Sequence, residues 1–314
     1  MDWDDYIGGG ILHGDADVAP IESGAIKTTY RIDTESDSYI LQTVDTGDEW
    51  RLHQQREVYD RLSDTAVPSP DVVYDAADEE VPYQVVEAID GDNLNDRYHE
   101  MPDSTRLAVV EEAGRYLAAA HDKLSMDDCG WLYGTENGLE VDAADSWRSF
   151  YRGFLHDMLD TVEDGPLDRD DLTDELRATV DATIDNVPVD PDTSIVHRDY
   201  DPDNLVEDDG EIAAVLDWGN AFAGDPLYDY ARAEHSFAGR FADDERVERT
   251  RERFRASYEQ RQPIDDRLYE VYRLGALIDQ AAALTWCQDN AFDFDDSVFD
   301  GHRDVLREQV DRVD

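Results

Sequence analysis

Residues 194–231, SIVHRDYDPDNLVEDDGEIAAVLDWGNAFAGDPLYDYA, decide the fold of this 314-residue chain. Two short apolar runs in this stretch, Ser194–Val196 and Ile212–Leu216, have the length and composition of buried β-strands. Polar side chains of distinct chemistry stand at the ends of these runs. They are His197 and Asp199 after the first run, Asn204 five residues beyond Asp199, and Asp217 at the end of the second run.

The spacing of these residues predicts a phosphoryl-transfer site. Asp199 can face an acceptor hydroxyl and take its proton, while the loop is long enough to curl back and present the Asn204 amide oxygen. Asp217 would deliver a carboxylate to the same cation. Mg²⁺ prefers oxygen ligands and takes few from the protein when nucleotide phosphates supply the rest. One Asp and one Asn are therefore enough.

The same stretch resembles the catalytic core of the aminoglycoside phosphotransferase and choline kinase-like superfamily, small-molecule relatives of protein kinases. Its pattern is His-x-Asp-x-x-x-x-Asn, a strand ending Asp-Trp, and Gly-Asp-Pro-x-x-Asp, which here also includes Trp218, Asp225 and Asp229. The resemblance implies that ATP is the phosphoryl donor, that Asp199 is the catalytic base, and that Asn204 and Asp217 hold Mg²⁺. Asp225, Asp229 and His197 are expected to brace the loop.

The resemblance also implies an α+β, two-lobed, protein-kinase-like fold. Residues 1–91 would form a small antiparallel, β-rich lobe that covers the nucleotide, and residues 92–314 a larger helical lobe with the catalytic loop and the acceptor site. The apolar patterns predict strands over 25–33, 38–44, 72–74 and 83–89, and a loop over 130–138. They predict helices over 50–62, 147–159, 172–184 and 268–286, and an amphipathic helix from Ser104.

Residues 23–30 stand where this family places its nucleotide-covering turn, so Gly24 and Lys27 are expected to contact the nucleotide. Glu57 matches the glutamate that normally pairs with a basic residue on the third strand, but that strand carries Gln42 at the basic position. Gln42 can hydrogen-bond a phosphate oxygen but brings no charge.

Two interpretations of Lys27 stay open: its ammonium reaches the phosphates in place of the missing charge, or it is a solvated loop lysine. Glu87–Ala88–Ile89 resembles the hinge between lobes, where the backbone at Glu87 and Ile89 would bind adenine.

Composition restricts the environment and the partners. The chain carries 78 Asp and Glu against 27 basic residues, a net charge of −51, where a small soluble domain carries about 2–8. The acid is spread along the sequence, which is typical of a halophile, because molar salt shortens the Debye length to about 3 Å and screens the repulsion. The absence of a basic stripe argues against nucleic acid. No apolar run suits a membrane span, no cysteine pattern indicates disulfides or zinc, and the first residues do not resemble a signal peptide, so we expect a cytoplasmic protein.

Three functions fit the sequence. The first is an ATP- and Mg²⁺-dependent kinase acting on a hydroxyl of a small molecule. The second is a non-catalytic nucleotide-binding regulator, which Gln42 favours. The third is a protein kinase, which Arg198 in the His-x-Asp motif favours and the missing DFG and APE signatures disfavour. The acceptor and the oligomeric state cannot be read from the residues. Candidate acceptor contacts are the 130–134 loop, Tyr228, Trp286 and Phe292.

Overall fold

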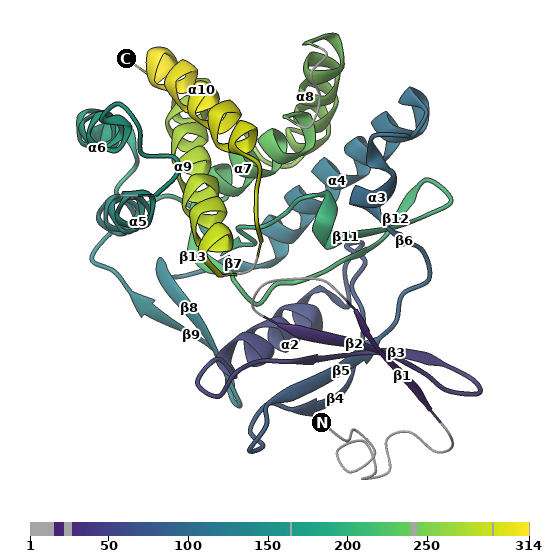
Figure 1. The fold of residues 1–314 in the computed structure, drawn as a ribbon. Helices are drawn as coiled ribbons and strands as arrows, with labels where there is room; N and C mark the ends of the chain where they lie inside the picture. The colour runs from purple at the N-terminus through teal and green to yellow at the C-terminus, as the bar shows by residue number, and fades with distance from the viewer. Residues whose placement is uncertain (1–15, 22–26, 164, 240–243, 291, 314) are drawn as a thin grey trace.

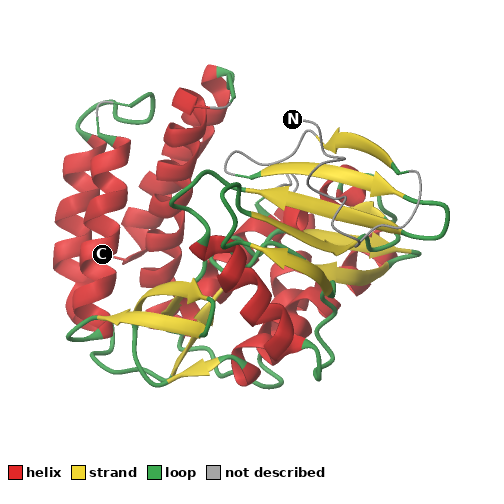
Figure 2. Ribbon diagram, turned by 90° about the horizontal axis from the view of Figure 1, so that it is seen from below, coloured by secondary structure: helices red, strands yellow, loops and turns green. Residues whose placement is uncertain are grey.

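The structure is a computed structural model, and it describes residues 16–21, 27–163, 165–239, 244–290 and 292–313. Gly24 lies outside the described residues. A five-stranded sheet with one helix lies at one end, and a larger, mainly helical part lies at the other (Figure 1). Seen from below, the strands of this sheet gather on one side and the longest helices on the other (Figure 2). We call these parts the sheet lobe and the helical body.

The sheet lobe is antiparallel throughout, with strand order β1-β2-β3-β5-β4. Its elements are β1 (Asp17–Ile21), β2 (Thr28–Asp33), β3 (Ser38–Thr43), α2 (Trp50–Leu62), β4 (Val72–Ala76) and β5 (Tyr83–Glu87). The predicted hairpin, helix and two later strands are confirmed, and α2 has the predicted ends. β1 was not predicted; its residues DVAPI are mostly exposed, so they lack the apolar alternation of a half-buried strand.

The helical body is built from eight α-helices within the described residues, together with short 3-10 turns and strands. The helices are α3 (Leu94–Tyr98), α4 (Asp103–Lys123), α5 (Trp147–Val162), α6 (Leu172–Thr183), α7 (Pro226–Ala238), α8 (Asp244–Tyr258), α9 (Asp266–Asn290) and, after the loop at 292–295, α10 (Asp296–Val313), of which α3 is a single short turn. The predicted helices are all present. Together with the antiparallel sheet lobe they confirm the α+β, two-lobed expectation.

The prediction of a loop over 130–138 is wrong. Residues Gly130–Thr135 form β8 and Gly138–Ala143 form β9, paired as an antiparallel hairpin. Three glycines in nine residues suggested a loop, but Gly130 and Gly138 supply positive φ at the hairpin's ends, while Trp131 and Leu132 alternate between half-buried and buried. The hairpin belongs to a second sheet, of order β7-β10-β13-β8-β9, with β7 (Ser125–Met126), β10 (Thr193–Val196) and β13 (Phe222–Gly224).

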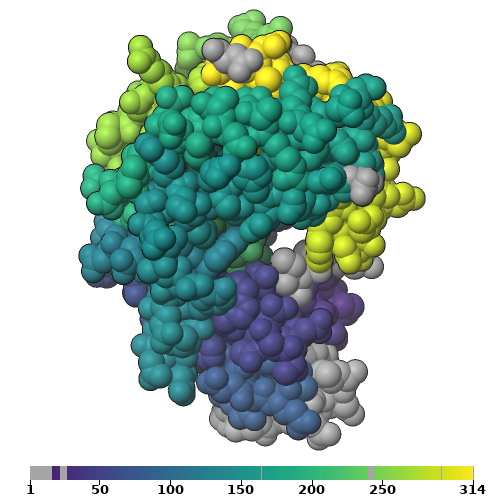
Figure 3. All heavy atoms as spheres, turned by 90° about the vertical axis from the view of Figure 1, so that its left-hand side faces the viewer, coloured from purple at the N-terminus to yellow at the C-terminus, as the bar shows by residue number. Residues whose placement is uncertain are grey.

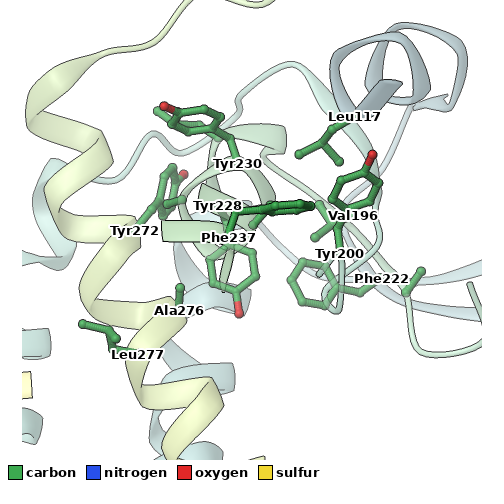
Figure 4. Packing of buried hydrophobic residues seen from close by; sticks show 14 of the residues in the cluster. Leu117, Val196, Tyr200, Phe222, Tyr228, Tyr230, Phe237, Tyr272, Ala276 and Leu277 are labelled. Carbon is green, nitrogen blue, oxygen red and sulfur yellow. The ribbon is translucent and has the colours of Figure 1, made fainter. Parts of the chain in front are cut away.

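The main hydrophobic core lies inside the helical body. Aromatic rings fill it: Phe222, Tyr228 and Tyr272 lie between β13, α7 and α9, beside Ala276 and Leu277 of α9 (Figure 4). Trp147 stacks on Tyr151 with ring centroids 5.2 Å apart. Burial of this many large rings gives the body a rigid frame for the loop that follows β10.

The two parts meet through α2. Gln54 of α2 donates from Nε2 to the carbonyls of Leu132 (3.2 Å) and Ala221 (2.8 Å), both in the helical body. Gly134 of β8 lies so close to α2 that an added Cβ would meet Gln54 N at 1.9 Å. Elsewhere a notch separates the purple sheet lobe from the yellow C-terminal helices (Figure 3). In the part of the chain that is described, no helix is long and apolar enough to cross a bilayer.

Candidate active site

A β-hairpin brings Asn204 and Asp217, the two predicted metal ligands, close together. β11 (Leu205–Asp208) and β12 (Glu211–Val215) pair antiparallel, with Leu205 opposite Val215, and β6 (Asp92–Asn93) adds a third strand. Asn204 directly precedes β11 and Leu216 follows β12, and the N–H of Leu216 donates to the carbonyl of Asn204 (2.9 Å). Residues 204 and 217 therefore end side by side, although thirteen positions of chain separate them.

Asp199 lies in contact with Asn204. The Asn204 Nδ2 donates to the backbone carbonyl of Asp199 (2.8 Å) and to its Oδ2 (3.1 Å). Because the amide nitrogen is used inward, the amide oxygen of Asn204 is left to accept or to ligate. The Asp199 side chain is 45 % exposed, so an acceptor can reach it.

Asp217 sits at the other side of this loop in a strained conformation, with φ +60°. Its Oδ1 accepts from Lys27 Nζ at 2.6 Å, and its N–H donates to the Tyr59 hydroxyl of α2. Burial alone would raise the pKa of Asp217, but the Lys27 ammonium outweighs burial and holds that pKa below its ordinary value. Asp217 is therefore an ionised carboxylate, and it faces the sheet lobe.

A buried carboxylate of α7 holds the catalytic loop from behind. Asp229 accepts the backbone N–H groups of His197 (2.8 Å) and Arg198 (2.9 Å), and the Nε2 of His121 (3.1 Å). His197 accepts the Asp199 N–H at Nδ1 and donates from Nε2 to the carbonyl of Leu216 (2.8 Å). His197 thus ties the loop to the end of β12, as the sequence predicted for a bracing residue, and Asp225 caps α7 by accepting the N–H of Leu227.

A chain of alternating charges leads from the core to Asp199. Arg198 donates to Asp279 of α9 (2.7 Å), Asp279 lies 3.4 Å from Arg232 of α7, and Arg232 donates to Asp199 Oδ1 (2.9 Å). Burial would raise the pKa of Asp279, but Arg198 and Arg232 lower it. Arg232 and Asp279 were not predicted. Arg232 lies one helical turn after Asp229 on α7. A helix that starts at Pro226 places both residues on one face, so the sequence could have indicated Arg232, whereas no local pattern indicates Asp279.

The expectation that Glu57 faces the third strand is wrong. Gln55 of α2 is the residue that contacts Gln42: its Nε2 donates to Gln42 Oε1 (2.7 Å) and to Gln84 Oε1 (3.1 Å). Glu57 is turned away, and its Oε1 accepts from Arg56 (3.0 Å). Two positions along a helix are about 200° of rotation, so only one of residues 55 and 57 can face the sheet.

Glu87 ends β5 and leads into the predicted hinge. Its N–H donates to Asp71 and that of Ala88 donates to Ser38, so the segment continues the sheet edge toward Ile89. A contact of Glu87 and Ile89 with adenine stays a prediction. Of the predicted acceptor contacts, Trp131 and Tyr228 pack in the core, whereas Trp286 and Phe292 are 40 % and 49 % exposed.

The chemistry of the donor set suits Mg²⁺. An amide oxygen at Asn204 and a carboxylate at Asp217 are the oxygen ligands that Mg²⁺ accepts alongside phosphates and water. Among the described residues, no group of three or more His, Cys, Asp or Glu is arranged to hold a metal by itself.

Known proteins resemble this chain in sequence and in fold. The sequence profile of the phosphotransferase enzyme family matches residues 17–274. Hygromycin-B 4-O-kinase of Escherichia coli is 23 % identical over 227 residues, which cover 69 % of this chain and 61 % of the relative. The match therefore spans less than two thirds of that enzyme's length.

Solved structures share the fold. The aminoglycoside phosphotransferase APH(4)-Ia, in a ternary complex with AMP-PNP and hygromycin B, aligns with a TM-score of 0.71 at 20 % identity, over 98 % of both chains. APH(2'')-IIa, in complex with gentamicin, aligns with a TM-score of 0.57 at 15 % identity, over 100 % of this chain and 96 % of that one. At these identities the alignments show the two-lobed fold of these kinases.

Proposed function

Because the chain belongs to the phosphotransferase enzyme family, we propose that it is an ATP- and Mg²⁺-dependent kinase that phosphorylates a hydroxyl group of a small molecule. The observation that carries the proposal is the meeting of Asp199, Asn204 and Asp217 at the base of one hairpin. Residues 1–91 would cover the nucleotide, with Gly24, Lys27 and Gln42 toward the phosphates and Glu87 and Ile89 toward adenine, while residues 92–314 would hold the acceptor. The predicted role of Glu57 in nucleotide binding has no support from its position.

In this proposal Asp199 orients the acceptor hydroxyl and takes its proton. The hydroxyl oxygen forms a bond to the γ-phosphorus, the bond from that phosphorus to the β–γ bridging oxygen breaks, and ADP leaves. Arg232 and Asn204 each donate to one carboxylate oxygen of Asp199, so the carboxylate is fixed in one orientation before the acceptor arrives. Each oxygen keeps a further lone pair for the hydroxyl.

Asn204 and Asp217 would hold Mg²⁺, which supplies charge neutralisation at the phosphates when bound. Asp217 suits this role because it is ionised and its left-handed backbone turns it toward the sheet lobe. The alternative, a non-catalytic nucleotide-binding regulator, rests on Gln42 alone. A regulator would not need Asp199 clamped by two donors yet 45 % exposed.

The acceptor is proposed only as a hydroxyl-bearing small molecule. Hygromycin B is the substrate named for the E. coli relative, and it is one candidate for a first substrate panel. The net charge of −51 supports a halophilic host and an assay in molar KCl, and we propose a cytoplasmic site of action, where ATP is available.

Two substitutions test the proposal. Asp199→Asn should lower kcat by about 10²- to 10⁴-fold, the range for loss of a general base, and leave the Kd of Mg·AMP-PNP unchanged. Asp217→Asn should weaken that Kd and raise the Mg²⁺ concentration needed for turnover. Asp209→Asn is the control, since Asp209 is exposed at the hairpin turn and Asn tolerates its φ of +50°. Turnover of Asp199→Asn near that of the control, measured by ADP release over the panel, would refute the assignment.

A further inference from the structure

The ammonium of Lys27 lies between α2 of the sheet lobe and the end of the β11–β12 hairpin. Its side chain is 8 % exposed, and Nζ donates to Asp217 Oδ1 (2.6 Å) and to Gln55 Oε1 (2.7 Å). Gly219 also borders it, since a Cβ there would lie 3.2 Å from Nζ. The interpretation of Lys27 as a solvated loop lysine is therefore wrong.

The side chains that link Lys27 to the sheet are uncharged, and the nearest other cation, Arg51 of α2, is directed to the Gly219 carbonyl (3.2 Å) and Asn220 Oδ1 (3.1 Å). Gln42 of β3, Gln84 of β5 and Gln55 of α2 form a chain of side-chain amides, in which Gln55 donates to the other two. Gln84 in turn donates to the carbonyl of Leu52. A basic residue at 42 and an acid facing it from α2 would form an ion pair here. Both members are glutamines instead, so the charge is missing from the strand and from the helix together.

Gln55 links Lys27 to the sheet. Its Oε1 accepts from Lys27 while its Nε2 donates to Gln42, so one amide group lies between the ammonium and the strand residue. An amide can make both contacts at once, whereas a glutamate at 55 would only accept and would neutralise the ammonium. Asp217 is thus the single carboxylate in contact with Lys27 among the described residues.

We propose that Lys27, which directly precedes β2, supplies the cation that contacts the nucleotide phosphates in place of a basic residue at position 42. The inference rests on the proposed function. Asp217 is the carboxylate that would hold the metal, and the metal would bind the phosphates, so an ammonium 2.6 Å from Asp217 lies within reach of a phosphate oxygen. In this structure Lys27 pairs with Asp217 itself. Binding of the Mg²⁺–nucleotide complex exchanges the partners: Asp217 passes to the metal and Lys27 to the phosphates.

Nucleotide affinity tests the proposal without turnover. Lys27→Met should raise the Kd of Mg·AMP-PNP about 10- to 100-fold, the range for losing a hydrogen bond to a charged group. Lys123→Met is the matched control, because Lys123 is the one other lysine of the sequence and pairs on the surface with Asp64. The double variant Lys27→Met/Gln42→Lys should recover most of the affinity, since it returns the cation to the strand. Gln55→Glu should weaken binding in the native background, because it would hold Lys27 away from the phosphates.

Chemical labelling of the native protein gives a readout that does not depend on a folded variant. An ATP derivative with an acyl group on its γ-phosphate acylates an amine next to the phosphates and releases ATP. Mass spectrometry should find the acyl group on Lys27, and excess Mg·ATP should prevent it, while Lys123 stays unlabelled.

The outcomes separate this inference from the proposed function. Native protein that binds no nucleotide would overturn both. Native protein that binds Mg·AMP-PNP, with Lys27→Met binding equally well and Lys27 unlabelled, would overturn only the role of Lys27.

Discussion

Replacing Asp229 with asparagine tests whether one buried carboxylate holds the catalytic loop in its working shape. Asp229 is completely buried on α7 and accepts three hydrogen bonds. Its Oδ2 takes the His197 N–H and His121 Nε2, and its Oδ1 takes the Arg198 N–H. Arg198 has a φ of +68°, a conformation that costs a non-glycine residue about 1–3 kcal/mol unless its surroundings impose it.

Asparagine has the same shape but only one acceptor oxygen. If that oxygen keeps the two donors at Oδ2, its NH₂ group faces the Arg198 N–H, and a charge-assisted bond becomes a contact between two donors. Loss of a bond to a charged group costs about 1.5–3 kcal/mol, and an unsatisfied buried donor about 1–3 kcal/mol. The two costs overlap, so we expect the free energy of unfolding to fall by about 2–4 kcal/mol. Arg198 would relax, Asp199 would move with it, and kcat would fall.

Urea unfolding in molar KCl measures the first effect, and ADP release measures the second. Asp209→Asn serves as the control, since it makes the same chemical change at an exposed position. An Asp229→Asn variant with the same unfolding midpoint, the same m-value and the same kcat as this control would refute the reasoning.

The loss of unfolding free energy caused by Asp229→Asn should also depend on pH. Burial alone would raise the pKa of Asp229, but its hydrogen bond from His121, together with His197 and the Arg198 N–H, holds that pKa below the ordinary value of a carboxyl group. A carboxyl whose pKa is lower in the folded protein stabilises it fully above the unfolded-state value, about 3.9, and loses that contribution as pH falls further. The difference between native protein and variant should therefore be constant from pH 7 to about 5 and shrink below pH 4. A difference that stays constant down to the acid limit of folding would contradict this.

Two further predictions concern the lobe contact and the solvent. Gly134→Ala should lower the melting temperature, because its Cβ would meet backbone atoms of Gln54 (1.9 Å) and His53 (2.4 Å) that cannot move aside, whereas Gly153→Ala, in open space on α5, should raise it slightly. The Kd of the native protein for Mg·AMP-PNP should fall as KCl rises from low to molar concentration, over the range where circular dichroism shows a folded protein. A Kd that rises steadily with KCl concentration would contradict this prediction.

The sequence predicted those helices and strands whose apolar residues follow a regular periodic pattern. α2, α4, α5, α6 and α9 have apolar residues at intervals of three and four, and they were predicted with nearly their observed ends, whereas α10 was not predicted. The β8–β9 hairpin was missed because each strand has six residues and its glycines resemble a loop. β1 was missed because an edge strand with exposed side chains has no pattern to detect.

The site residues also fall into two groups, those that the sequence pattern predicted and those that it did not. Asp199, Asn204 and Asp217 lie within nineteen positions of sequence and are joined by one hairpin, so their spacing carried the prediction. Gln55 could not be chosen over Glu57, because the choice depends on how α2 is rotated on the sheet. Burial of Leu52, Val58, Tyr59 and Leu62 fixes that rotation, and it takes residue 55 inward. Arg232 and Asp279 depend on the packing of α7 against α9, which no local pattern encodes.

Two kinds of charge act on an anionic ligand: cations in direct contact with it and surface acids that repel it from a distance. Salt screens the second kind more than the first, so salt should help the ligand to bind. Around the site three carboxylates contact cations: Asp217 pairs with Lys27 (2.6 Å), Asp279 with Arg198 (2.7 Å) and Asp199 with Arg232 (2.9 Å). The net charge of −51 therefore comes from outside this set, mostly from acids spread over the surface. Surface acids repel a nucleotide across distances longer than the Debye length, about 3 Å in molar salt, so salt removes most of that repulsion. A phosphate in contact with a Lys27 side chain that is 8 % exposed is screened far less. High salt thus weakens the repulsion more than the attraction, and the glutamines around Lys27 add no carboxylate to Asp217 that would compete with the ligand for its ammonium.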